Sequence, residues 1–133
     1  MSGSHYGLMA RSLSLLKCRK GTFAVEFALV APALLLFAFG IIEGGRALWT
    51  LSALHYAVEE AARCASINSV ICGTASQIKT FAAGRSGAGF TASVFVAAVT
   101  TCGNEVSASY PMQLNIPYAN HSITLTASSC YPI

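Results

Sequence analysis

A long apolar run over residues 22–42 is the feature that most constrains what this chain can fold into. Glu26 is the only ionisable side chain in the run. At about 1.5 Å per residue, these residues form a helix of roughly 31 Å, which matches the hydrocarbon core of a bilayer. We therefore expect one membrane-spanning helix over residues 22–42, with residues 43–133 outside the bilayer.

The charged residues are placed unevenly around this run. Of the eight Lys and Arg residues, four precede Thr22 with no acidic residue among them. Beyond the run, Glu43 and Arg46 cancel. The positive-inside bias then predicts a cytoplasmic basic leader over residues 1–21 and a periplasmic or extracellular domain over residues 43–133. The part that folds has no basic cluster, so the sequence gives no support for nucleic-acid binding.

The presence of Glu26 in the span requires an explanation, because burying a carboxylate within a membrane helix costs free energy. One interpretation is an interfacial glutamate near the end of the span. The other uses the spacing from Gly21, since cleavage after Gly21 makes Thr22 the new N-terminus. The ammonium of Thr22 and the carboxylate of Glu26 then lie at one end of the same helix. In a helical filament, the carboxylate of one subunit would neutralise the ammonium of its neighbour.

The segment KGTFAVEFALVAPALLLFAFGIIEGGRALWTLSALHYAVEEAAR resembles the TadE-like minor pseudopilins of the tight-adherence (Tad/Flp) pilus system. Gly21, Glu26 and Phe27 match the processing motif of that family. The apolar run with Pro32 and the following residues 43–46 match its continuation. The close resemblance covers about residues 19–65, and the remainder of the chain fits only in general character.

This resemblance implies a type IV pilin-like fold and cleavage between Gly21 and Thr22 by a prepilin peptidase. The leader that is removed begins at Met1 or at Met9. The chain is then a peptidase substrate and a minor pilin, held in the inner membrane by contacts with lipid. Its partners are other pilins and the assembly machinery, and its roles are pilus assembly, adhesion and biofilm formation. The alternative is an unprocessed single-span anchor that presents a small periplasmic domain to an envelope or secretion assembly.

The apolar helix is expected to continue beyond the membrane as an amphipathic one. Its apolar positions recur every three or four residues, which places them on one face; they are Leu48, Leu51, Leu54, Val58, Ala61 and Ala65. After a loop over residues 68–73, Thr74 and Gln77 have capping-box spacing. They predict a short helix that runs to Ala83 and is closed by Gly84.

The remainder of the chain is typical of β-structure. Apolar and polar residues alternate over residues 105–110 and 122–128, as in half-buried antiparallel strands. Residues 90–100 are apolar on both faces, which favours a central strand, and Pro111 and Pro117 bracket an expected loop. The predicted fold is therefore α+β: a long N-terminal helix on a small antiparallel three-stranded sheet, with one short extra helix.

The chain has five cysteines, and the predicted topology separates them. Cys18 lies in the leader, whereas Cys64, Cys72, Cys102 and Cys130 lie outside the cytoplasm, where disulfides persist. We expect two pairs: Cys64–Cys72, which joins the end of the helix to the loop after it, and Cys102–Cys130, which the expected strand directions bring together. A Cys72–Cys102 pair competes with them. The sequence has no Cys-x-x-Cys motif, which counts against a zinc site and a thiol-exchange enzyme.

No catalytic constellation is apparent in the sequence. The histidines His5, His55 and His121 are isolated, and the chain has no aspartate. We therefore expect no enzymatic activity, no cofactor, no metal and no small-molecule substrate. The function classes that remain are the processed pilin and the unprocessed anchor, which differ in whether the mature chain begins at Thr22.

Overall fold

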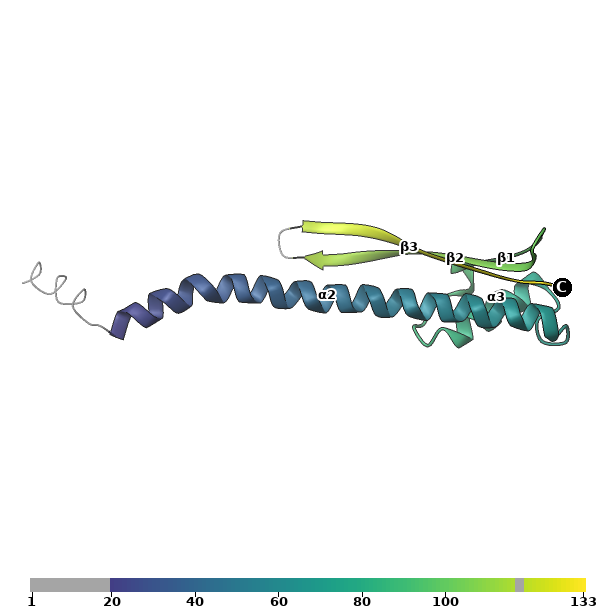
Figure 1. Cartoon of the computed structure of the whole chain (residues 1–133), viewed down its shortest axis with the longest axis horizontal. Coiled ribbons are helices and arrows are strands. Elements are labelled where there is room, and N and C mark those ends of the chain that lie inside the picture. Colours follow the sequence, from purple (N-terminus) through teal and green to yellow (C-terminus); the bar gives the residue numbers. More distant parts are fainter. Residues whose placement is uncertain (1–19, 117–118) are drawn as a thin grey trace, which may run out of the picture. The chain divides into compact units, whose positions relative to one another are not determined.

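The computed structural model describes residues 20–116 and 119–133 of the chain (Figure 1). It divides into two compact units, residues 1–39 and 40–133. The described part of the first unit is helical, and almost all of its side chains are exposed. The three strands found among the described residues all lie in the second unit. One continuous helix, α2 (Lys20–Ile67), contributes residues to both units and contains Pro32.

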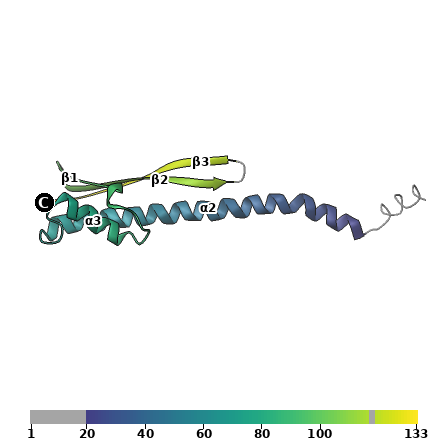
Figure 2. The same cartoon turned by 180° about the vertical axis from the view of Figure 1, so that it is seen from behind.

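The sheet of the second unit is a meander of three antiparallel strands (Figures 1 and 2). The strands are β1 (Phe95–Thr100), β2 (Gly103–Ile116) and β3 (Ala119–Tyr131), and their order in the sheet is β1-β2-β3. Ala108 of β2 lies opposite Phe95 of β1 and Ala127 of β3. The β2–β3 register is continuous, with no bulge, and both strands extend well beyond Phe95, the first residue of β1.

The core of the second unit forms where α2 meets one face of the sheet. Leu54 and Val58 of α2 and Phe95 and Val106 of the sheet are almost completely buried in one cluster. The apolar face predicted for the helix is correct from Leu54 onward, while Leu51 and Ala65 are half-buried. The prediction is wrong at Leu48, whose exposed fraction is 68%. The other buried residues of α2 are Ala57, Ala61, Ala62 and Cys64.

The short helix begins as the sequence predicts but ends later. In α3 (Ala75–Arg85), Thr74 accepts a hydrogen bond from the Gln77 N–H (3.3 Å), and the Gln77 side chain accepts one from the Thr74 N–H (3.0 Å). The expectation that Gly84 closes this helix is wrong. Gly84 is a helical residue, and the cap is Ser86, which is buried and whose N–H donates to the carbonyl of Ala82 (3.1 Å).

Two expectations about the strands are also wrong. The expected central strand over residues 90–100 is shorter and lies at an edge, because residues 92–94 form the 3₁₀ turn η2 (Ala92–Val94) and only β1 continues into the sheet. The central strand is β2. Pro111 lies within β2 and not at the start of a loop, and its partner in β3 is Thr124.

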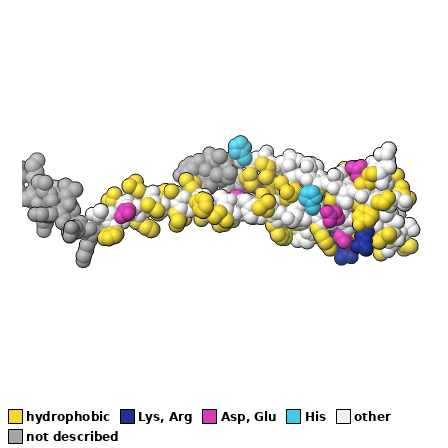
Figure 3. Space-filling model, in the orientation of Figure 1, with side chains coloured by type: hydrophobic (Ala, Val, Ile, Leu, Met, Phe, Trp, Pro, Cys, Tyr) yellow, Lys and Arg dark blue, Asp and Glu magenta, His cyan; other side chains and the backbone are white. Residues whose placement is uncertain are grey.

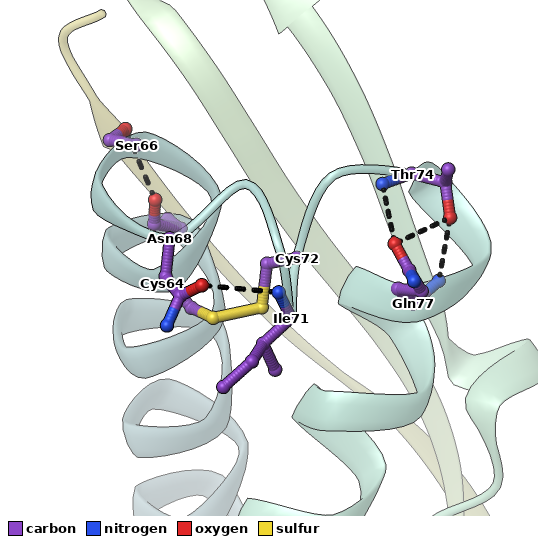
Figure 4. The surroundings of a disulfide bond; sticks show 8 residues. Cys64, Ser66, Asn68, Ile71, Cys72, Thr74 and Gln77 are labelled. Carbon is purple, nitrogen blue, oxygen red and sulfur yellow. Dashed lines mark hydrogen bonds between the residues drawn. A yellow bond between two sulfur atoms is a disulfide. The ribbon is translucent and has the colours of Figure 1, made fainter.

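Two disulfides fasten the second unit, Cys64–Cys72 and Cys102–Cys130. They are the two pairs expected from the sequence. Because Cys72 and Cys102 each bond to another cysteine, the competing Cys72–Cys102 pair does not form. Figure 4 shows the first, which joins the last turns of α2 to the loop that follows. Within that loop the side-chain oxygen of Asn68 accepts a hydrogen bond from the Ile71 N–H (3.1 Å). The second disulfide joins the β1–β2 turn to the end of β3.

Candidate functional site

The residues of the candidate processing site lie at the beginning of α2. Gly21 and Thr22 are already helical, and Glu26 and Phe27 follow on the next turn. All four residues are exposed. No heavy atom lies within 4 Å of the place that a Cβ on Gly21 would take. The bond expected to be cut is therefore not covered by other described parts of the chain.

Glu26 is surrounded by apolar side chains of its own helix. It lines a shallow open hollow together with Phe23, Phe27 and Val30. Positions separated by three, four and seven residues share one face of a helix, so the carboxylate lies on an aromatic and aliphatic face. Figure 3 shows that hydrophobic side chains predominate along this part of α2. Over residues 21–115, no hydrogen bond or ion pair of the Glu26 carboxylate is present.

The next acidic residue of α2 has a partner, in contrast to Glu26. The guanidinium of Arg46 donates to both carboxylate oxygens of Glu43, at 2.8 and 2.9 Å. The Glu43 side chain is 14% exposed and that of Arg46 is 50% exposed. In the sequence these two residues stand out only as charges that cancel. Their i,i+3 spacing is the signal that predicts a direct pair.

The helix that carries these residues is suited to a membrane. Among the described residues, α2 is the one helix long and apolar enough to cross a bilayer. Its side chains between Gly21 and Phe39 are almost all exposed. This part of the helix therefore contacts its surroundings on all sides. In water, a helix with this composition would expose a large apolar surface. Lipid or neighbouring apolar helices would bury that surface.

A histidine of the second unit lies in a surface hollow. His55 lies in an open hollow of about 440 Å³ that is otherwise formed by aliphatic and hydroxyl residues. These are Val94, Val96, Ser107, Ala108, Ser109, Thr126, Ala127 and Ser128. No carboxylate is among the lining residues, so the hollow offers no acid–base pair. Within residues 20–116 and 119–133, no three His, Cys, Asp or Glu residues group as metal ligands would.

Comparison with known families identifies the segment that carries the candidate site. A family model described as TadE-like protein matches residues 21–63. The match contains Gly21, Thr22, Glu26 and Phe27, and it confirms the resemblance found in the sequence. No curated protein and no solved structure matches the chain. The chain thus carries a TadE-like domain over residues 21–63, the kind of domain found in proteins associated with the Tad pilus.

Proposed function

We propose that this chain is a minor pilin of a Tad pilus, made as a precursor and cut between Gly21 and Thr22 by a prepilin peptidase. The observation that supports this most is the position of the glycine and glutamate motif. It lies in the TadE-like segment, at the exposed start of an apolar helix. The TadE-like family is a structural family, and the proposed role is that of a subunit and not of an enzyme.

The proposed orientation follows from the charge of the leader. The basic residues before Gly21 stay in the cytoplasm, residues 22–42 span the inner membrane, and residues 43–133 fold in the periplasm. After cleavage, the new ammonium of Thr22 and the carboxylate of Glu26 both have to enter an apolar environment on assembly. Glu43 already has Arg46 as a partner on its own helix (2.8 Å). Glu26 is therefore the acidic residue available to pair with a neighbouring subunit's N-terminus.

The proposal separates two steps, processing and assembly, and each has its own variant. Gly21→Ala is expected to block cleavage, so the precursor accumulates in the membrane. A Cβ at this position meets no atom within 4 Å, so the defect reflects access by the peptidase and not misfolding. Gly40→Ala is the matched control, because its Cβ is equally free of neighbours, and its precursor should be cut normally. The measurement is the mass of the mature N-terminus.

Glu26→Ala is expected to be cut normally but to be lost from filaments. Its assembly would bury an N-terminal ammonium without a partner, and breaking such a pair costs about 3–5 kcal/mol. Glu43→Gln is the control, since it removes an acidic residue from the same helix but leaves Arg46 half exposed (50%). Shed filaments should contain the control and lack Glu26→Ala. Normal assembly of Glu26→Ala would show that charge pairing is not the mechanism.

The alternative function, a static envelope anchor, predicts a different mature chain. An anchor keeps its leader, so mass spectrometry would find an N-terminus at Met1 or Met9 and no Thr22. It would also remain in the membrane fraction when filaments are sheared from cells. An intact leader on the wild-type protein, in cells that make the pilus, would therefore overturn the pilin proposal.

A further inference from the structure

The strand β3 is a long edge strand without the usual protection of an edge. It is 13 residues long, well above the typical strand length of about 5–6 residues. In the described chain it pairs with β2 alone, along its whole length. Its sequence, ANHSITLTASSCY, contains no Lys, Arg, Asp, Glu or Pro. Natural sheets place such residues on edges to prevent pairing with other chains.

The opposite edge of the sheet, formed by β1 and by the part of β2 that β1 does not cover, is protected. The outer edge of β1 is only six residues long, and α3 packs against both β1 and η2. The part of β2 that extends beyond β1 contains Pro111. Proline has no N–H to offer and is a common way to close an edge. The contrast singles out β3 as the edge that is left open.

The register shows which backbone groups this edge presents. Pro111 has no N–H to donate to β3. We therefore assign Pro111 and Thr124 as a non-hydrogen-bonded pair of the β2–β3 ladder. In an antiparallel ladder the rungs alternate, and this register has no bulge. The N–H and C=O groups of Ser122, Thr124, Thr126 and Ser128 therefore point away from β2. Their side chains are exposed on the outer face of the sheet.

We propose that the open edge of β3 receives an extended, uncharged segment of a different pilus subunit, which adds a fourth strand antiparallel to β3. A row of alternating donors and acceptors at strand spacing is satisfied by an extended polypeptide. The segment is uncharged because β3 offers no charge to pair with it. It is antiparallel because parallel sheets are normally covered on both faces, whereas the outer face of this sheet is exposed. The inference rests on the proposed function, and it names the partner's chemistry.

A second copy of this chain does not fit the same edge. Within the second unit, β3 runs in the same direction as α2 (Figures 1 and 2). Two copies that pair β3 with β3 antiparallel are related by an axis perpendicular to the sheet, which reverses α2 in one of them. Copies inserted in one membrane with the same topology cannot adopt that arrangement. The unpaired part of β2 in a second copy is interrupted by Pro111.

The first test blocks the edge without altering the internal ladder. In the full-length protein, Thr126→Pro removes one outward N–H, while Thr126→Val keeps the N–H and replaces the hydroxyl with a methyl group. We expect both variants to be cut at Thr22 and to form both disulfides. Thr126→Pro should fall at least tenfold in the filament fraction, and Thr126→Val should match the wild type. Incorporation of Thr126→Pro at the wild-type level would overturn the proposal.

The second test uses the wild-type protein and does not depend on the folding of a variant. Residue-level hydrogen exchange compares the detergent-extracted chain with the chain in isolated filaments. In the extracted chain, the amides of Thr124 and Thr126 should exchange quickly and those of Ile123 and Leu125 slowly. In filaments all four should be slow. Fast exchange of Thr124 and Thr126 in filaments would show that the edge stays open.

The outcomes distinguish this inference from the proposed function. An intact leader contradicts the pilin proposal. A correct Thr22 terminus with a Thr126→Pro variant that assembles contradicts only the added strand. The identity of the partner is tested with Thr126→Cys. A disulfide-linked dimer of Thr126→Cys copies in oxidised filaments would show a second copy at the edge and overturn the choice of a different subunit.

Discussion

The side chain of Asn104, the second residue of β2, donates a hydrogen bond to the hydroxyl oxygen of Ser66 in the last turn of α2 (3.3 Å). The same hydroxyl has one proton and two carbonyl acceptors, Ala62 on its own helix at 3.3 Å and Tyr131 at 3.4 Å. Ser66 thereby joins the end of the long helix to the beginning of β2 and the end of β3. The contact ties together segments that are distant in the sequence, outside the apolar core.

Removal of this junction should lower the free energy of unfolding of the second unit. We expect Asn104→Ala and Ser66→Ala each to cost about 1 kcal/mol, the usual net value of one hydrogen bond. Because the two side chains contact each other, their effects should not add, and a double-mutant cycle should give a coupling of at least about 0.5 kcal/mol. Denaturant unfolding of the detergent-solubilised protein provides the measurement. Fully additive losses would show that the contact contributes nothing.

Leu54 and Leu48 lie on the same helix in different surroundings, and they form a matched pair for testing the core. Leu54 is fully buried, whereas Leu48 is 68% exposed. Leu54→Ala should destabilise the second unit by about 2–5 kcal/mol, since it removes contacts and leaves a cavity. Leu48→Ala should change stability by less than about 0.5 kcal/mol, as surface substitutions do. Equal effects in denaturant unfolding would contradict the packing of α2 on the sheet.

Gly103 and Gly84 should respond in opposite ways to the same substitution. Gly103 has a φ of +125°, and a Cβ there would overlap the carbonyl oxygen of Tyr131 and the Cα of Pro132. Gly103→Ala should therefore cost about 1–3 kcal/mol. Gly84 is inside α3 and a Cβ there meets no atom within 4 Å. Gly84→Ala should stabilise the unit by about 0.5–1 kcal/mol. Thermal unfolding of both variants tests this, and stabilisation by Gly103→Ala would be inconsistent with the turn described.

The two disulfides should differ in how much they stabilise the second unit. Their sequence separations are 8 for Cys64–Cys72 and 28 for Cys102–Cys130. The loop-entropy relation gives about 2.5 kcal/mol for the shorter loop and about 3.6 kcal/mol for the longer one. Replacing both cysteines of a pair by serine should thus cost about 1 kcal/mol more for Cys102–Cys130. Comparing the denaturant midpoints of the two double variants decides the order, and the reverse order would point to strain or structure in the unfolded chain.

The sequence predicts well the features that are local. The capping box of α3 is written in Thr74 and Gln77, three residues apart, and the structure forms both of its hydrogen bonds. The alternation of β2 and β3 is equally local, because side chains of a strand point to opposite faces in turn. The candidate processing residues also lie within one short motif, so their position at the start of an apolar helix follows from the sequence.

Features that depend on contacts between distant segments are predicted poorly. Two apolar faces suggested that residues 90–100 form the central strand, yet Val96 and Val99 of β1 are 55% and 71% exposed. The position of β2 in the centre comes from two successive hairpins, which place the middle strand between its sequence neighbours. Because proline is unfavourable inside a sheet, the sequence predicts a loop at Pro111, but proline is tolerated where its missing N–H faces an open edge. The Ser66–Asn104 contact has no signal in the sequence at all.

The Cys102–Cys130 disulfide has a consequence for the way in which this domain would bear mechanical load. It connects the turn before β2 to the end of β3. The disulfide thus links the two open ends of the β2–β3 hairpin covalently. Tension applied beyond Tyr131 passes from Cys130 directly to Cys102 and then into β1. The β2–β3 pairs from Glu105–Cys130 onward lie outside this covalent path, so the tension does not break them one after another. A load applied at that end would therefore be borne by covalent bonds before it reached the β2–β3 pairing.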